Sequence, residues 1–200
     1  MAQLFFIYST MNSGKSLDLL KSAHNYTIQG KVPLLFTSEF DTRNIEITDN
    51  DLKGEIFTRV GLKQEAWLIE RVNVISLVKS SNADCIFVDE AQFLKEKHVI
   101  TLTEIVDKLN VPVICYGLKN DFLNNLFEGS KMLLTYADKI QEMKTICFYC
   151  NRKATMNMRL INNVPHFSGQ QICIDENKQD KEVSYLPVCR KCYMNFKQGK

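Results

Sequence analysis

The 200-residue chain lacks several features that mark whole classes of protein. No apolar run approaches the roughly 20 residues that a membrane-spanning helix needs. The first ten residues, MAQLFFIYST, contain neither a basic n-region nor a small-residue cleavage site. Internal repeats, low-complexity tracts and Pro/Gly-rich linkers are also missing. We therefore expect a cytoplasmic protein with no membrane partner.

The chain also lacks a large excess of charge of one sign. Its 25 Lys and Arg face 23 Asp and Glu, for a net charge of +2, which is too small to bind nucleic acid through bulk electrostatics. Residues 151–200 alone hold nine basic and four acidic residues, so a basic tail remains an option. The hydrophobic content of 45% is typical of a globular chain, and the length suits one domain with or without a small appendage.

Up to about residue 142, short apolar runs alternate with helical periodicity. The apolar runs cover residues 4–8, 32–36, 83–88 and 111–116, and helical spacing is found at 17–24, 66–79, 99–109 and 126–137. Pro33 marks the second run as an edge strand or a strand start. This alternation predicts a parallel sheet covered on both faces by helices, with ligands at the carboxyl ends of the strands. Residues 44–65 are expected to form an exposed connection.

The helical period disappears after residue 143. Alternating segments at 158–161 and 171–175, with a turn at 165–169, suggest a hairpin. The change of pattern divides the chain into an α/β domain, residues 1–142, and a smaller domain, residues 143–200.

A phosphate-binding motif follows the first apolar run. Residues 9–16 read Ser-Thr-Met-Asn-Ser-Gly-Lys-Ser, a P-loop pattern with Ser9 in place of the leading Gly. The chemistry needs backbone N–H groups around the phosphates, the charge of Lys15, and the hydroxyl of Ser16 on Mg²⁺. The alternative is an incidental turn at a helix start, which the strand–turn–helix context disfavours. The predicted ATP-binding residues are Ser9, Met11, Asn12, Ser13, Gly14, Lys15 and Ser16.

An acidic pair ends the third apolar run, Cys-Ile-Phe-Val-Asp-Glu at 85–90. Asp89 is predicted to hold Mg²⁺, and Glu90 to accept a proton from the group that attacks the γ-phosphate. The alternative is that both acids cap the following helix. The pair alone does not distinguish water from a substrate hydroxyl as the nucleophile, so an ATPase and a kinase both remain open.

Two Cys-x-x-Cys pairs lie in the C-terminal part, at Cys147 and Cys150 and at Cys189 and Cys192. Four thiolates with this spacing favour a structural, tetrahedral Zn²⁺ that closes a long loop. The alternatives are free cysteines or two redox pairs. The other three cysteines, Cys85, Cys115 and Cys173, lie in apolar runs and are predicted to be core residues.

These motifs together, with Phe-Asp-Thr-Arg at 40–43 and the closing Pro-Val-Cys-Arg-Lys-Cys-Tyr, resemble the thymidine kinase family of the cellular, zinc-containing type (type II), in its bacterial form. The resemblance implies a RecA-like P-loop domain over residues 1–142. It also implies a zinc domain over 143–200, with a "lasso" loop between the cysteine pairs that closes over the nucleoside. The implied activity is transfer of the γ-phosphate of Mg²⁺·ATP to the thymidine 5′-hydroxyl, in DNA precursor synthesis. Homotetramers and feedback inhibition by dTTP are also implied.

The resemblance also assigns roles to individual residues. Glu90 matches the base that deprotonates the 5′-hydroxyl, and Arg43 matches an arginine that neutralises the transferring phosphoryl group. Asp41 is a weaker match to a substrate-binding residue. The positions that line the thymine slot are Met11, Phe93, Leu118, Phe122, Phe127 and Tyr185.

Two other functions compete with this one. A nucleic-acid-stimulated P-loop ATPase with a zinc hairpin would use the same acidic pair and the basic tail. Against it stand the near-neutral charge and the lack of a basic stripe with interleaved aromatic residues, so we expect no nucleic-acid partner. A zinc-ribbon adaptor with a vestigial P-loop is disfavoured by the intact Gly-Lys-Ser.

Overall fold

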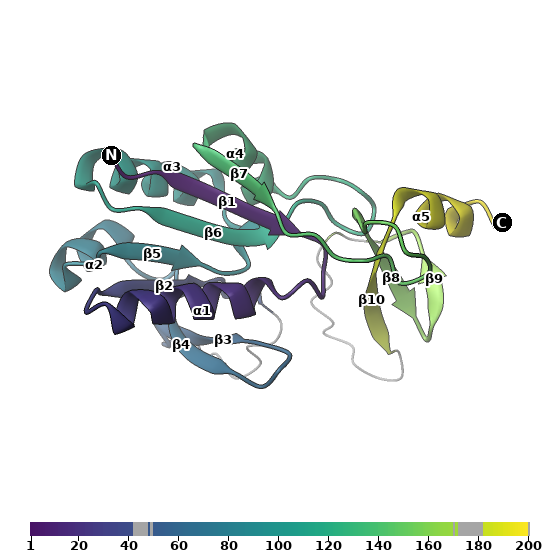
Figure 1. Cartoon of the computed structure of the whole chain (residues 1–200), viewed down its shortest axis with the longest axis horizontal. Helices are drawn as coiled ribbons and strands as arrows, with labels where there is room; N and C mark the ends of the chain where they lie inside the picture. The colour runs from purple at the N-terminus through teal and green to yellow at the C-terminus, as the bar shows by residue number, and fades with distance from the viewer. Residues whose placement is uncertain (42–47, 49, 170, 172–181, 200) are drawn as a thin grey trace.

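Two β-sheets organise the chain (Figure 1). The computed structural model describes residues 1–41, 48, 50–169, 171 and 182–199. Seven strands form the larger sheet, in the order β3-β4-β2-β5-β6-β1-β7, and three form the smaller one, in the order β10-β8-β9. The arrows of β1, β5 and β6 in Figure 1 point toward the smaller sheet, which therefore stands beyond the carboxyl ends of these strands.

The elements around the larger sheet alternate as the sequence predicts, except that three strands follow one another after the first helix. In chain order they are β1 (Leu4–Ser9), α1 (Lys15–Ile28), β2 (Pro33–Thr37), β3 (Lys53–Phe57), β4 (Lys63–Leu68), α2 (Val74–Ser81), β5 (Cys85–Val88), the 3-10 turn η1 (Ala91–Phe93), α3 (Glu96–Glu104), the π-helical turn η2 (Ile105–Leu109), β6 (Val113–Leu118), α4 (Glu128–Tyr136) and β7 (Lys139–Glu142). All neighbouring pairs are parallel except β3 with β4. The sheet is therefore mixed but mainly parallel.

Helices cover both faces of the larger sheet, as predicted. On one face, Leu19 and Ala23 of α1 pack against Phe87 of β5. On the other, apolar residues of α2, α3 and α4 pack against β1, β2 and β5. In Figure 1, α1 crosses in front of the sheet and α3 lies behind it. Cys85 and Cys115 are fully buried core residues, as expected.

The first helix begins where a left-handed residue turns the chain. Gly14, with φ 84°, precedes α1, and such a backbone is easy only for glycine. Gly30, with φ 74°, follows its last turn and ends it as predicted. Pro33 starts β2, which lies inside the sheet, so it marks a strand start and not an edge.

The prediction of one helix over 66–79 is wrong in its first half. Trp67 lies in β4, and the helix α2 begins only at Val74. The side chain of Asn73 caps that helix, because its Oδ1 accepts a hydrogen bond from the N–H of Ser76 at 3.0 Å. The expected exposed connection over residues 44–65 is also wrong from residue 53 onward, where β3 and the start of β4 form an antiparallel hairpin at the sheet edge.

The smaller sheet contains β8 (Met156–Ile161), β9 (Val164–His166) and β10 (Val183–Val188), and the helix α5 (Arg190–Lys197) follows it. A hairpin is present, but it is not the predicted one, because β8 pairs with β9 and the predicted turn at 165–169 overlaps β9. Asn162 and Asn163 form the turn with positive φ angles of 49° and 63°, as a two-residue hairpin turn requires, while Pro165 lies within β9. Of the expected strand at 171–175, residues 172–175 lie outside the described residues. Among the helices of the described ranges, none is long and apolar enough to cross a membrane.

Candidate active site

A cavity of about 660 Å³ opens at the carboxyl ends of the central strands. Ten of the predicted site residues line it: Met11, Asn12, Ser13, Gly14, Lys15, Ser16, Asp41, Glu90, Phe93 and Leu118. They come from segments far apart in the sequence and meet because parallel strands end on the same side of the sheet. The sheet topology therefore brings the phosphate-binding motif and the acidic pair to one place.

The phosphate-binding turn is held by its own main chain and by the segment after β7. The Lys15 ammonium donates to the carbonyl of Thr10 at 2.9 Å, and Lys15 is only 8% exposed. Ser9 does not line the cavity; its hydroxyl donates to the carbonyl of Met143 at 2.5 Å. Ser9 therefore connects the end of β1 to the segment that follows β7. A glycine at this position has no hydroxyl and would make no such bond.

The two acids at the end of β5 differ in their surroundings. Asp89 is buried, and its N–H donates to the carbonyl of Phe36 at 2.9 Å. Glu90 is half-buried, lines the cavity and has left-handed backbone angles of φ 50° and ψ 37°, which are uncommon for a residue with a side chain. Its side chain makes no capping hydrogen bond to η1. The alternative that Glu90 serves as a helix cap is therefore not supported.

The predicted thymine-slot residues fall into two groups. Met11, Phe93 and Leu118 line the cavity, whereas Phe122, Phe127 and Tyr185 are not among the described residues that do. The ring of Phe127 meets Phe93 edge-on, with centroids 5.9 Å apart, and Phe122 approaches Tyr185 at 6.5 Å. The second group thus adjoins the cavity wall or the smaller sheet.

The predicted catalytic arginine, Arg43, lies outside the described residues, as do residues 172–181 of the lasso segment 151–188. Asp41, just before Arg43, is buried, and its N–H donates to the carbonyl of Ser38 at 3.1 Å. The role of Arg43 stays a prediction.

Sequence reasoning missed three features of this site. Asn157 of β8 accepts a hydrogen bond from the Met11 N–H at 2.8 Å and donates one to the Asn120 carbonyl at 3.1 Å. Gln92 is 2% exposed and contacts Glu90. The end of β3 and the turn after it, residues 57–60, also line the cavity and include Arg59. Single polar residues of this kind carry no sequence pattern, because distant elements supply their partners.

The smaller sheet is fastened to the larger one near the cavity. Besides Asn157, the hydroxyl of Tyr193 in α5 donates to the carbonyl of Phe122 at 2.7 Å. The guanidinium carbon of Arg159 lies 4.5 Å from the centre of the Phe122 ring, a cation–π distance. The amide of Asn12 also donates to the Tyr185 carbonyl at 3.3 Å.

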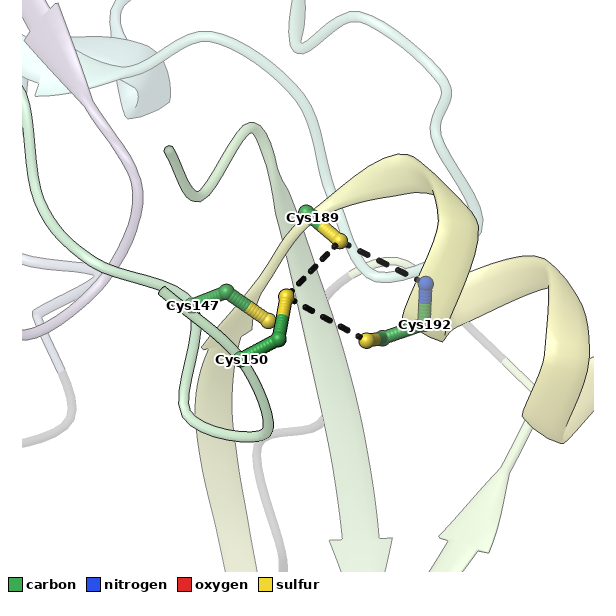
Figure 2. Close-up of side chains that lie close together, drawn as sticks. All are labelled: Cys147, Cys150, Cys189 and Cys192. Carbon is green, nitrogen blue, oxygen red and sulfur yellow. Dashed lines mark hydrogen bonds between the residues drawn. The ribbon is translucent and has the colours of Figure 1, made fainter. Parts of the chain in front are cut away.

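The four predicted metal ligands converge in one cluster (Figure 2). Their sulfur atoms all lie within 4.8 Å of one another. The Cys150 sulfur is 3.6 Å from that of Cys189 and 3.7 Å from that of Cys192. A disulfide requires about 2.05 Å, whereas four sulfurs each about 2.3 Å from a tetrahedral metal are about 3.8 Å apart. The cluster could therefore hold a metal ion such as zinc.

Local hydrogen bonding favours a thiolate in this cluster. The backbone N–H of Arg152, and then its side chain, lower the pKa of Cys150 to about 6, because donors stabilise the charged sulfur. Burial raises the pKa of Cys192 to about 12, with the neighbouring thiols adding to the effect. A cation at the centre would offset this cost and favour all four thiolates.

Together, the sheet order, the phosphate-binding turn after β1 and the acidic pair after β5 define a P-loop nucleotide-binding protein. The family model for thymidine kinase matches residues 2–193. The chain is 52% identical over 196 residues to the thymidine kinase of Lactococcus lactis, which covers 96% of this chain and 97% of that protein. It is 50% identical to those of Lactiplantibacillus plantarum, covering 96% of both chains, and Listeria monocytogenes, covering 98% of both. The chain belongs to the thymidine kinase family, as the sequence motifs predict.

Proposed function

We propose that the protein is an ATP:thymidine 5′-phosphotransferase, which makes dTMP and ADP. One observation carries this proposal beyond the family relationship. The phosphate-binding turn and Glu90 line the same cavity, so we assign an acceptor hydroxyl bound there a place near both a base and the γ-phosphate.

The triphosphate is assigned to the start of α1. Backbone N–H groups of residues 11–16 face the phosphates, and Lys15 supplies a positive charge. Ser16 and Asp89 are the proposed Mg²⁺ ligands; a hydroxyl and a carboxylate are the hard oxygen donors that this ion prefers. When bound, Mg²⁺ neutralises charge on the phosphate oxygens.

Glu90 is assigned the role of general base for the thymidine 5′-hydroxyl. Because a carboxylate must reach the hydroxyl within hydrogen-bonding distance, its place on the cavity wall matters more than its intrinsic basicity. Arg43 is assigned, from the family resemblance, to neutralise the transferring phosphoryl group. Met11, Asp41, Phe93 and Leu118 form the proposed nucleoside wall, with Phe122, Phe127 and Tyr185 behind it.

Zinc is the proposed occupant of the four-cysteine cluster, where a closed set of sulfur ligands gives a structural role. In this proposal residues 1–142 bind ATP, and residues 143–200 carry the zinc and the lasso loop that excludes water. Four further assignments rest on family resemblance alone: a homotetramer, inhibition by dTTP, a cytoplasmic location and a role in DNA precursor synthesis.

A transfer assay tests the proposal. Purified protein is incubated with γ-labelled Mg²⁺·ATP and thymidine, and in parallel with single-stranded DNA instead of thymidine; Lys15→Ala is the control for a contaminating kinase. Labelled dTMP in the thymidine reaction alone is expected. ADP release that depends on DNA, without labelled dTMP, would replace this function by that of a nucleic-acid-stimulated ATPase.

A further inference from the structure

Gln92 is a buried amide between Glu90 and the end of β6. Its side-chain oxygen accepts a hydrogen bond from the backbone N–H of Leu118 at 2.9 Å. Its side-chain nitrogen donates to the Glu90 carboxylate at 2.5 Å. The residue is only 2% exposed, and all three residues line the cavity. One side chain thus contacts both the proposed base and the proposed nucleoside wall.

The direction of these two bonds is fixed by chemistry. A backbone N–H can only donate, so the amide oxygen of Gln92 must face Leu118. The NH₂ group then faces Glu90, whose ionised carboxylate can only accept. A flipped amide would place two donors against each other at Leu118 and two acceptors against each other at Glu90. The pairing therefore selects one orientation of Gln92, with its NH₂ group on the Glu90 carboxylate.

The surrounding backbone leaves Gln92 little freedom. A Cβ atom on Gly117 would lie 3.0 Å from both the backbone nitrogen and the side-chain oxygen of Gln92. A Cβ atom on Gly129 would lie 2.4 Å from the carbonyl oxygen of Ala91 and 3.0 Å from that of Gln92. The 3-10 turn η1 is therefore packed between β6 and α4 at backbone contact. Leu118 is held at its carbonyl as well, because the Ser130 hydroxyl donates to that carbonyl at 2.5 Å.

We propose that Gln92 is the positioning residue for Glu90: it holds the Glu90 carboxylate toward the cavity and ties it to the main chain of Leu118. The inference rests on the proposed function, because it takes Glu90 as the base. A glutamate side chain has three rotatable bonds, and the left-handed backbone of Glu90 sets only where that side chain starts. The amide of Gln92 restricts the remaining rotations. Gln92 thereby fixes the Glu90 carboxylate relative to the nucleoside wall at Leu118. A nucleoside bound against that wall then keeps its 5′-hydroxyl at a constant distance from the base.

The test uses a substitution that keeps the shape of the side chain. In Gln92→Glu, one carboxyl oxygen still accepts from Leu118, while the other faces Glu90. Two carboxyls at this distance share one proton at neutral pH. The control is Gln29→Glu, at an exposed glutamine beyond the far end of the 14-residue helix α1 and hence about 20 Å from the phosphate-binding turn. The kcat and KM values for thymidine and ATP are measured between about pH 4 and pH 9, a range that includes the acidic limb expected for a carboxylate base.

We expect the acidic limb of the kcat profile of Gln92→Glu to move up by about one pH unit or more, with the control unchanged. In Gln92→Leu, kcat should fall about 30-fold, with the KM for ATP changed less than about threefold. Gly117→Ala, which keeps every polar group but crowds the amide, should lower kcat in the same way. An unmoved acidic limb in Gln92→Glu, or kcat within about twofold of wild type in Gln92→Leu, would overturn the proposal.

Glu90→Gln separates this inference from the proposed function. If Glu90→Gln is inactive while Gln92→Glu keeps the wild-type pH profile, Glu90 is the base and Gln92 does not position it. If Glu90→Gln is active, the base assignment itself is wrong, and the role given to Gln92 is overturned with it.

Discussion

Loss of the metal cluster is expected to open the smaller sheet while the larger sheet stays folded. The perturbation is Cys189→Ser, which removes one of the four converging sulfurs. Cys150 and Cys189 enclose 38 residues, 151–188. Closing a loop of this length removes conformational entropy worth about 4 kcal/mol at 25 °C in the chain-entropy model for cross-links. A metal that fixes both ends of the loop should contribute a similar amount.

The smaller sheet has few other contacts to replace that contribution. Among the described residues, the apolar cluster of this part contains, apart from the cysteines, the buried Met158, Leu160, Val188 and Tyr193, with Met156, Phe167 and Leu186 packed against them. A core of this size supports only a few kcal/mol of net stability, so a loss of about 4 kcal/mol is decisive. Opening would also break the hydrogen bonds that join Asn157 and Tyr193 to the loops at the cavity, and the KM for thymidine should therefore rise.

Hydrogen exchange read by mass spectrometry, with metal content measured on the same samples, provides the assay. We expect about one zinc per wild-type chain, and faster exchange in peptides from β8 and β10 of Cys189→Ser, with β5 peptides unchanged. Cys115→Ala is the matched control, because Cys115 is buried in the larger sheet and should leave zinc content intact. Metal-free protein with fully protected β8 and β10 would refute the reasoning.

Four further predictions follow from single contacts. Lys15→Ala should abolish measurable ATP binding in titration calorimetry, because it removes the charge at the phosphates; retained affinity would contradict the phosphate assignment. Gly129→Ala should destabilise the protein by about 3 kcal/mol or more in urea unfolding, because its Cβ would lie 2.4 Å from a backbone oxygen; an unchanged midpoint would be inconsistent with this packing. Asn157→Ala should raise the KM for both substrates, because it frees the Met11 N–H and the Asn120 carbonyl; unchanged KM values would exclude this coupling. Burial raises the pKa of Glu70, so ionising Glu70 costs stability in the folded state, and the stability of wild type relative to Glu70→Gln should decline as the pH rises from about 4 to about 7; a rise would show the wrong sign.

The parts of the fold that the sequence predicts are those that a pattern of a few consecutive residues identifies. Strands such as β5 are continuous apolar runs because both faces of the sheet are covered. Each Cys-x-x-Cys pair and the P-loop can likewise be recognised from a few consecutive residues. The site could be located for the same reason, because each motif follows a recognisable strand.

The strands of the larger sheet that sequence reasoning missed lie at its edges, β3 and β7, or next to an edge, β4. In β3 only Ile56 is fully buried, and β7 has no fully buried residue, so neither carries an apolar period. In the region taken as a single helix, Trp67 and Leu68 pair with β2, and only tertiary context separates that strand from α2. Gln92 and Asn157 are single polar residues that contact other elements. No local sequence pattern predicts such contacts.

The central claim is that Glu90 takes the proton from the acceptor hydroxyl beside the phosphate-binding turn. The most direct test is Glu90→Gln, which keeps the size and a hydrogen-bonding oxygen but removes the basic carboxylate. The account predicts that kcat for dTMP formation falls by about 100-fold or more, with ATP affinity close to that of wild type. Transfer at a near-normal rate by this variant would contradict it.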